Sequence, residues 1–466
     1  MLTRDEESIV ALCTPRGSGA IAIIRISGVS VSKIVDKISK LSSGKTLQEL
    51  SSHTIHHGHI INPINSEIID EVLFFLMNGP KTFTGQDTVE INCHNNQFII
   101  DKILQLVIIY GARLAKAGEF TKRAFLNNKI DLVQAEAIND VISAQTELAL
   151  KKSMSQLKGS LTSYVFEIEK DLIEILTFVE ASFEFLDEEQ RDLDFNKKIK
   201  EKISDLRKKL FIIRQNFNQQ QRIKDGIRIA IIGSVNVGKS TLFNALLKKN
   251  RAIVTNIAGT TRDSIEANLY KDGNFWLLID TAGLRQAGDV IEKKGIERSL
   301  LEAEKADIIL LVCDSKVLGF EQQLYLYKDI FEKYQKKVIV VLNKIDESID
   351  KKIEHTIQDS FKDTVMLVSA KNKTGIEEVA KKIQEKIQEL FEQLRSPFLL
   401  NQRQFHLVSE LEIKMKAIEK ECSNAVHYEL VAHCVRDILE HLSELTGKGV
   451  SEQVLDNVFS KFCIGK

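Results

Sequence analysis

The chain has 466 residues, which is too long for one ordinary hydrophobic core, so we expect about two to four domains. Hydrophobic residues make up 43% of the chain and charged residues 28%, as is typical of soluble globular proteins. The formal net charge of −1 argues against a globally basic surface that binds nucleic acid and leaves open only a local basic patch.

The cysteines and the apolar runs of the sequence indicate the cellular compartment of the protein. The 6 cysteines are scattered without a Cys-x-x-Cys pair, which argues against a zinc site and against a disulfide framework. No apolar run reaches the length of a transmembrane helix. The start "MLTRDEESIVALCTP" is acidic and soon enters a predicted strand, unlike a signal or transit peptide. We therefore expect a cytoplasmic protein that does not interact with membranes.

The N-terminal part, residues 1–127, has a mixed α and β pattern. The β-branched runs "GAIAIIRISG" and "IIDEVLFFLM" and the alternating "DTVEINCH" predict strands. The stretch "NQFIIDKILQLVIIYGARLA", residues 96–115, has the 3.6-residue spacing of an amphipathic helix. These patterns predict an α+β domain.

The pattern changes along the rest of the chain. Residues 128–222 predict continuous helix, because apolar residues recur at three- and four-residue spacing and proline is absent. Residues 223–385 alternate short apolar strands with helices, which predicts a mostly parallel sheet covered on both faces. Residues 386–466 are again helical. Since the two helical segments share amphipathic character, we expect them to pack into one domain, with the α/β module inserted between them.

A phosphate-binding loop opens the α/β module. "GSVNVGKS", residues 233–240, fits the pattern GxxxxGK[ST] between the strand "IRIAII" and the helix "TLFNALLKK". Its glycines let backbone N–H groups close around phosphate oxygens at the positive end of the helix. We expect Lys239 to reach the β- and γ-phosphates and the Ser240 hydroxyl to ligate Mg²⁺. The alternative is a chance glycine-rich turn, and the strand–loop–helix context argues against it.

Later motifs complete a guanine-nucleotide site. Asp280 ends a strand and begins "DTAG", which suits an acidic residue linked to the metal and a glycine that senses the γ-phosphate. In "NKID", residues 343–346, the Asp346 carboxylate can accept two N–H bonds from guanine, a pattern that adenine does not offer. "SAK", residues 369–371, follows the last strand, where a loop that covers the base belongs. The order of the motifs predicts a Ras-like P-loop GTPase domain within a multidomain α/β fold.

Residue 284 raises a question about hydrolysis. In many GTP-hydrolysing switch proteins a glutamine follows the DxxG motif and orients the attacking water. Leu284 stands in that place here, and leucine neither donates nor accepts a hydrogen bond. Either GTP hydrolysis is slow or another group orients the water. In "GTTRD", residues 259–263, we expect the Thr261 hydroxyl to contact Mg²⁺ when the γ-phosphate is present.

Three further stretches resemble the MnmE family (also called TrmE) of tRNA-modification GTPases. They are "TPRGSGAIAIIRISG" near the start, "NNKIDLVQAEA" at 127–137 and the terminal "FCIGK". The resemblance covers essentially the whole chain. It implies an N-terminal domain, residues 1–127, that dimerises and binds folate. It also implies a helical domain, residues 128–222 and 386–466, that carries the inserted G domain, residues 223–385.

The resemblance also implies an activity and partners. With the flavoprotein MnmG (also called GidA) in a heterotetramer, the protein would install a (carboxymethyl)aminomethyl-type group on the wobble uridine of certain tRNAs. The one-carbon unit would come from a tetrahydrofolate derivative, 5-formyl- or 5,10-methylene-tetrahydrofolate. The alternative is a ribosome-assembly or signalling GTPase whose other domains only bind RNA or protein partners. The terminal Cys-Ile-Gly-Lys favours tRNA modification.

The family offers an answer to the question at residue 284. There a K⁺ ion near the β- and γ-phosphates stands in for an arginine finger, and it offsets charge that develops in phosphoryl transfer. A glutamate orients the attacking water through a second water, and by resemblance this is Glu292. The alternative for Glu292 is an exposed residue in the first turn of a helix. The implied K⁺ ligands are Asn236, Thr255, Ile257 and Thr260, and the implied catalytic residues are Glu292, Lys239 and Asn236.

The full expected nucleotide site combines the P-loop, the switch loop, the DTAG motif and the two base motifs. GDP or GTP with Mg²⁺ would contact Asn236, Val237, Gly238, Lys239, Ser240, Thr241, Thr255, Asn256, Ile257, Ala258, Gly259, Thr260, Thr261, Asp280, Thr281, Ala282, Gly283, Asn343, Lys344, Asp346, Ser369, Ala370 and Lys371.

For the folate derivative the resemblance points to Arg25, Glu90, Lys129 and Lys466. The basic side chains could pair with carboxylates, and Glu90 could accept N–H bonds from the pterin. An ordinary surface salt bridge is the alternative for each residue. Cys463 is a possible functional thiol, although only nearby lysines mark it as activated.

Two positions depart from the family pattern. "NCHNNQ", residues 92–97, replaces the usual His-Gly-Gly-Pro, and the tolerance of asparagine for positive φ would keep the turn. Gln86 stands where the family has an acidic residue. Separately, "HTIHHGHI", residues 53–60, gathers four histidines (His53, His56, His57 and His59), for which a metal site is the minor alternative to a polar strand.

Overall fold

The structure is a computed structural model that describes residues 7–185, 193–215, 217–234, 236–249, 265–271, 273–280, 300–314, 320–347, 351–361, 365–392, 396–421 and 428–465. The chain forms two compact units. The first contains Met1–Asn139, Ser155–Leu206 and Glu410–Lys466, and the second contains Asp140–Met154 and Arg207–Ser409. Among the described helices, none combines the length and the apolar character that crossing a bilayer requires.

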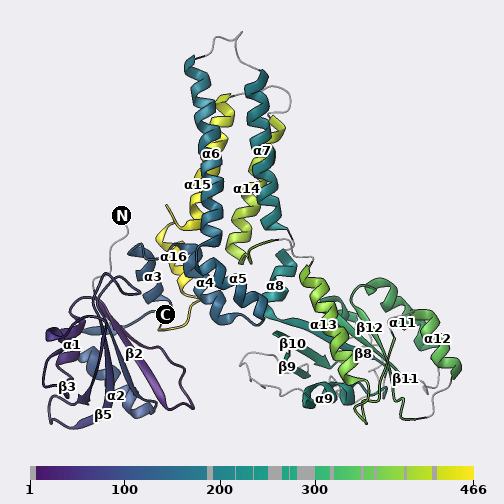
Figure 1. The fold of residues 1–466 in the computed structure, drawn as a ribbon, viewed down its shortest axis with the longest axis horizontal. Helices are drawn as coiled ribbons and strands as arrows, with labels where there is room; N and C mark the ends of the chain where they lie inside the picture. The colour runs from purple at the N-terminus through teal and green to yellow at the C-terminus, as the bar shows by residue number, and fades with distance from the viewer. Residues whose placement is uncertain are drawn as a thin grey trace. The chain divides into compact units, whose positions relative to one another are not determined.

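The N-terminal part of the first unit is a 7-stranded sheet in the order β3-β4-β5-β6-β2-β1-β7 (Figure 1). Neighbouring strands run antiparallel, except that β1 and β7 are parallel. The strands are β1 (Ser8–Leu12), β2 (Ile21–Ser27), β3 (Ser39–Leu41), β4 (Thr54–Ile61), β5 (Ile68–Met77), β6 (Thr88–His94) and β7 (Ala112–Leu114).

One face of this sheet is closed by helices. Helices α1 (Val31–Asp36) and α2 (Gln97–Ile109) pack on it, and a short 3₁₀ helix η1 (Leu47–Glu49) follows β3. Along β5 the side chains alternate, because successive residues of a strand point to opposite faces. Phe74 is buried in the core and Leu73 is exposed on the opposite face.

The expected helix over 96–115 is too long. Helix α2 ends at Ile109, the chain turns at Gly111, and Ala112–Leu114 form β7. Strand β7 pairs with β1 and so completes the edge of the sheet. The apolar residues of β7 continue the helical spacing by coincidence, and the long-range pairing with β1 decides their conformation.

The expected continuous helix over 128–222 is also wrong in detail. The described residues of this stretch form five helices, with turns around Thr146 and Gly159. The Thr146 hydroxyl accepts a hydrogen bond from the Ala149 N–H at 3.0 Å, which caps the start of one of them. The helices are α4 (Leu132–Ser143), α5 (Glu147–Leu157), α6 (Ser160–Phe185), α7 (Leu193–Arg214) and α8 (Phe217–Asp225).

Long helices from distant parts of the sequence lie side by side, as Figure 1 shows for α6, α7, α14 (Gln402–Glu421) and α15 (Tyr428–Thr446). In α15 the buried residues recur at helical spacing and pack toward α6. Lys202 of α7 pairs with Glu174 of α6 at 2.7 Å. The two helical segments of the sequence therefore do pack together.

The C-terminal end of the first unit packs on the N-terminal part. Helix α16 (Glu452–Phe459) lies against α3 (Glu119–Leu126), and Lys122 Nζ lies 2.6 Å from Asp456 Oδ1. Leu132, Phe459 and Phe462 belong to one buried apolar cluster beside them. This packing brings the last residues of the chain to the first sheet.

The second unit contains a 6-stranded sheet in the order β13-β12-β11-β8-β10-β9. All neighbouring strands are parallel except β9 and β10. The strands β8, β11 and β12 are nearly continuous apolar runs, as expected where helices cover both faces. The strands are β8 (Ile227–Gly233), β9 (Ile265–Lys271), β10 (Asn274–Asp280), β11 (Ile308–Asp314), β12 (Val338–Asn343) and β13 (Val365–Leu367).

Helices cover this second sheet on both sides (Figure 1). One core contains residues of α9 (Lys239–Lys249) and α13 (Ile376–Glu392), and the other contains residues of α11 (Phe320–Tyr334) and α12 (Lys351–Phe361). Together with the α+β part and the long helices of the first unit, a mostly parallel sheet between two layers of helices confirms the multidomain α/β class.

Candidate functional site

The loop between β8 and α9 has the geometry of a phosphate-binding loop. Asn236 has φ 64 and Gly238 has φ 94, so backbone N–H groups turn inward along the loop. A Cβ on Gly238 would lie 2.2 Å from Asn343 Nδ2, so only glycine fits there. The described residues of this segment thus have the strand, the turn and the helix that the sequence predicts around a P-loop.

The lysine of this loop is held inside it. Lys239 is 7% exposed, and its Nζ donates hydrogen bonds to the carbonyl oxygens of Gly233 at 2.7 Å and Ser234 at 2.6 Å. Phosphate oxygens carry more negative charge than carbonyl oxygens, so they compete well for this ammonium group. Ser240 and Thr241 follow in the first turn of α9, and both are exposed.

Asn343 connects the phosphate loop to the base motifs. Its Nδ2 donates to the Val237 carbonyl at 2.8 Å, and its Oδ1 accepts the Ala370 N–H at 3.0 Å. The carboxamide thereby links the base motifs to the phosphate loop, which lies 106 positions earlier in the chain. Lys344 Nζ pairs with Asp314 Oδ2 at 2.6 Å.

The predicted guanine-binding carboxylate is held by the SAK loop. Ser369 Oγ donates to Asp346 Oδ1 at 2.6 Å and accepts the Asn372 N–H at 3.1 Å. The hydrogen bond from Ser369 thus fixes the orientation of the Asp346 carboxylate. This arrangement suits recognition of the two N–H groups on the edge of guanine. Lys371 lies exposed in the same loop.

The remaining nucleotide residues are only partly described. Asp280 is 2% exposed at the end of β10, where it pairs in register with Ile231 of β8. Because β8 and β10 are parallel neighbours, Asp280 and the P-loop lie at the same edge of the sheet. The other predicted residues lie outside the described ranges: Thr255, Asn256, Ile257, Ala258, Gly259, Thr260, Thr261, Thr281, Ala282, Gly283 and Glu292.

A second polar site lies on the first unit. Arg25 of β2 and Glu90 of β6 face each other across the sheet, and Arg25 Nε donates to Glu90 Oε1 at 2.7 Å. The Arg25 guanidinium also lies 5.7 Å from the centre of the Phe120 ring. Both charged side chains keep about a quarter of their surface exposed, 25% and 21%. Lys129 is exposed.

The terminal segment of the chain lies beside this site. Cys13 Sγ, just after β1, is 3.2 Å from the Gly465 carbonyl oxygen, and the Gly118 N–H donates to the Cys463 carbonyl at 3.4 Å. Cys463 is exposed, and Lys466 lies outside the described residues. Strand β1 is the register partner of β2, which carries Arg25. The sequence does not predict this contact of Cys13, because no local pattern links the residue to the far end of the chain.

A buried charge network supports this region. Arg113 Nη2 pairs with Glu119 Oε1 at 2.6 Å, and Arg123 Nη1 donates to Gln86 Oε1 at 3.0 Å. Burial alone would raise the pKa of Glu119, but hydrogen bonds from Arg113 and from the Lys116 N–H outweigh it and lower the pKa to about 2. Gln86, the departure from the family pattern, is thus a hydrogen-bond acceptor here.

The turn after β6 differs from the expected one. Neither Asn95 nor Asn96 has positive φ; Asn96 is extended at φ −112 and caps α2 by accepting the Phe98 N–H at 2.9 Å. His94 Nδ1 lies 2.7 Å from Asp70 Oδ1, and this hydrogen bond raises the pKa of His94. The helix cap decides the conformation of Asn96, since an extended N-cap residue can use its side chain to bond the helix N–H groups.

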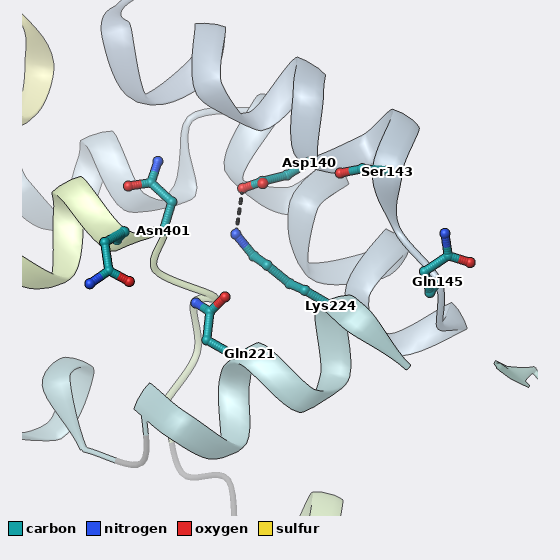
Figure 2. Close-up of a pocket in the computed structure, with 7 residues that line it drawn as sticks. Asp140, Ser143, Gln145, Gln221, Lys224 and Asn401 are labelled. Carbon is teal, nitrogen blue, oxygen red and sulfur yellow. Dashed lines mark hydrogen bonds and ion pairs between the residues drawn. The ribbon is translucent and has the colours of Figure 1, made fainter. Parts of the chain in front are cut away.

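A polar hollow of about 370 Å³ lies in the second unit where α8 leads into β8 (Figure 2). Lys224 Nζ and Asp140 Oδ2 are 2.7 Å apart across it, and Gln221 Nε2 donates to the Leu400 carbonyl at 3.1 Å. The Gln221 bond ties the segment that enters the α/β module to the segment that leaves it, and the Lys224 pair ties the entering segment to α4. The residues that line the hollow are Asp140, Ser143, Gln145, Gln221, Lys224, Asn401 and Gln402.

Comparison with known proteins decides the family. Residues 132–463 match the family model of the MnmE helical domain, and residues 8–129 match the model of the GTP-binding protein TrmE N-terminus. The chain belongs to the MnmE family of tRNA modification GTPases. The chain is therefore a GTP hydrolase that acts in tRNA modification.

Relatives that match this chain along its full length are named tRNA modification GTPase MnmE. The "tRNA modification GTPase MnmE" of Ligilactobacillus salivarius is 36% identical over 472 residues, covering 100% of this chain and 99% of the relative. Those of Acetivibrio thermocellus and Geobacillus thermodenitrificans are 39% and 38% identical, each covering 99% of both chains. The match to the MnmE family thus extends over the N-terminal sheet, the helices and the nucleotide site alike.

Proposed function

We propose that this GTPase drives the addition of a (carboxymethyl)aminomethyl-type group to the wobble uridine of certain tRNAs, together with a flavoprotein partner of the MnmG type. The observation that carries the proposal is the match along 99–100% of the chain to proteins named tRNA modification GTPase MnmE. The packing of the terminal Cys-Ile-Gly-Lys segment against the N-terminal sheet supports it, since a ribosome-assembly or signalling GTPase has no evident use for such a site.

In this proposal the G domain uses the P-loop as follows. Lys239 exchanges the carbonyl oxygens of Gly233 and Ser234 for phosphate oxygens. Ser240 and Thr261 hold Mg²⁺, for which the exposed hydroxyl of Ser240 at the first turn of α9 is suited. Bound Mg²⁺ would neutralise charge on the phosphates. Asp346, oriented by Ser369, selects guanine.

In the proposal, a K⁺ ion and Glu292 replace the glutamine that is absent at residue 284. Asn236 is exposed, and its positive φ places it at the rim of the P-loop, so its carboxamide oxygen is accessible to a K⁺ ion. Such an ion would offset charge that develops on the phosphates. Thr255, Ile257 and Thr260 as further K⁺ ligands, and Glu292 as the residue that orients water, rest on the family resemblance.

The folate derivative would bind on the first unit. Arg25 and Glu90 combine a cation and an anion that both remain partly exposed, as a ligand with carboxylates and pterin N–H groups requires. Exposed Lys129 and the terminal Lys466 would add positive charge. Cys463 is exposed beside this face, which suits a functional thiol of still unassigned role. The ligand would be 5-formyl- or 5,10-methylene-tetrahydrofolate.

A homodimer through the N-terminal domain is part of the proposal. The face of the sheet opposite the helices carries the exposed apolar residues Ile21, Ile55 and Leu73, at 60%, 58% and 40% exposure. A group of exposed apolar side chains on one face suits contact with another protein surface. Two copies, with two flavoprotein subunits, would form the heterotetramer that binds tRNA in the cytoplasm.

Each segment of the sequence is assigned its own function. We assign residues 1–127 to the folate-binding and dimerisation domain, 128–222 and 386–466 to the helical domain, and 223–385 to the G domain. The Gln221–Leu400 bond joins the two helical segments at the point where the G domain is inserted, and the Lys224–Asp140 pair joins the start of the G domain to α4.

Mass analysis of the wobble uridine in tRNA tests the proposal. Cells that lack this protein should lose the modified nucleoside and accumulate the unmodified one, and the cloned gene should restore the modification. Unchanged wobble uridine in the deletion, together with defective ribosomal subunits, would favour the alternative of a ribosome-assembly GTPase.

A further inference from the structure

The first residue after β8 is held by a tyrosine from a distant helix. Tyr327 of α11 accepts a hydrogen bond from the Ser234 N–H at 2.8 Å, and its hydroxyl lies 2.7 Å from Ser234 Oγ. The same hydroxyl donates toward the Val312 carbonyl at 3.4 Å. Tyr327 therefore connects the start of the P-loop to helix α11 and to strand β11.

The ring of Tyr327 is a rigid support for this hydroxyl. The residue is 3% exposed and belongs to the core between the sheet and helices α11 and α12, with Ile232 and Ile330 in the same cluster. Burial raises the pKa of Tyr327 to about 12, so the hydroxyl keeps its proton at neutral pH. It can therefore accept from one group and donate to another at the same time.

Ser234 connects Tyr327 to Lys239. Its N–H and hydroxyl bond to Tyr327, and its carbonyl accepts a hydrogen bond from Lys239 Nζ at 2.6 Å. The neighbouring Gly233 packs closely on β11, where a Cβ at Gly233 would lie 2.3 Å from the Val312 carbonyl oxygen. The position of Ser234 thus sets where the Lys239 ammonium rests.

We propose that Tyr327 is a positioning residue for nucleotide binding, which acts through Ser234 to hold the first turn of the P-loop and Lys239 ready for the nucleotide phosphates. Without the hydroxyl, the Ser234 N–H loses its acceptor and the loop must be ordered at the expense of nucleotide binding. The cost of ordering the loop arises when the nucleotide binds, before the chemical step. The loss therefore falls on affinity and not on the chemical step.

The test is Tyr327→Phe in the full chain, which removes one oxygen and keeps the ring in the core. We expect KM for GTP and Kd for a fluorescent GDP analogue to rise about three- to tenfold, with kcat changed less than about twofold. Tyr334→Phe is the matched control, because Tyr334 is in the same helix and is partly exposed. It should leave KM, Kd and kcat unchanged.

Ser234→Ala, alone and combined with Tyr327→Phe, shows whether Tyr327 acts through Ser234. The double variant should weaken GDP binding by less than the product of the two single effects. If Tyr327→Phe lowers the melting temperature but leaves KM and Kd at wild-type values, Tyr327 is a core residue only and the proposal is wrong. Effects that multiply independently contradict the route through Ser234. Only nucleotide binding and GTP hydrolysis are measured, so the outcome does not depend on tRNA modification.

Discussion

The Cys13 thiol lies 3.2 Å from the Gly465 carbonyl oxygen, so the two ends of the described chain meet beside the N-terminal sheet. Gly465 has φ 94, and a Cβ there would lie 2.6 Å from the Leu12 carbonyl oxygen. The backbone of the terminal segment thus packs directly on the end of β1. This contact brings the terminal segment to β1, the neighbour of the strand that carries Arg25, without any sequence motif that links the two ends.

Gly465→Ala should displace the terminal segment. The methyl group meets the β1 backbone and the left-handed conformation adds strain, so we expect tRNA modification to fall at least about fivefold while GTP hydrolysis stays unchanged. Gly449→Ala is the matched control, because Gly449 has a similar φ of 78 but open space around it. Equal modification by the two variants would show that the packing of the terminal segment does not matter.

Potassium should control hydrolysis. Replacing Na⁺ by K⁺ is expected to raise kcat for GTP at least about tenfold, because a monovalent cation at Asn236 offsets charge in phosphoryl transfer. Asn236→Gly should abolish the difference between the salts and retain nucleotide affinity, since glycine accepts the φ of 64 at this position without strain. Steady-state rates in matched chloride salts measure this, and equal wild-type rates in both salts refute the K⁺ mechanism.

Asp346 should set the choice of base. Asp346→Asn replaces an acceptor by a group that also donates, so GTP affinity should fall about a hundredfold and affinity for xanthosine triphosphate should rise. Ser369→Ala removes only the 2.6 Å hydrogen bond behind Asp346 and should weaken GTP binding without altering the preference. Competition with labelled GTP measures both variants. A loss of affinity for both nucleotides in Asp346→Asn would contradict direct base recognition.

Glu119 should stabilise the first unit in a pH-dependent way. Its pKa is lowered from 4.5 to about 2 in the folded chain, so its contribution is complete above about pH 4.5 and is lost as the pH falls toward 2. The shift corresponds to up to about 3 kcal/mol at neutral pH. Glu119→Gln should therefore unfold at lower urea concentration at pH 7, and the gap should narrow below about pH 4.5. A gap that is constant with pH would contradict the ion-pair explanation.

Local motifs made the nucleotide site predictable. A P-loop needs a fixed spacing of glycine, lysine and serine between a strand and a helix, and the base motifs end buried strands. Asn343 and Ala370 come together because parallel strands end at one edge of the sheet, as their 3.0 Å hydrogen bond shows. The mixed α and β pattern likewise predicted the class of fold.

Long-range contacts account for what the sequence did not reveal. Residues 112–114 form a strand because β1 offers an unpaired edge, although their spacing is helical. Asn96 is extended because it caps α2, not left-handed as its residue type allows. The bond from Ser234 to Tyr327 spans 93 positions, and neither residue type marks it in advance.

Transfer of a labelled carbon tests the central proposal most directly. We would incubate the purified chain with the flavoprotein partner, unmodified tRNA, K⁺, Mg²⁺, GTP and an amine source. The carbon donor is 5,10-methylene-tetrahydrofolate that carries ¹³C at the methylene bridge. Mass analysis of the wobble nucleoside should show the label with GTP and none with a non-hydrolysable analogue. Label that appears equally with the analogue, or no label under either condition, would contradict a GTP-driven use of the folate carbon.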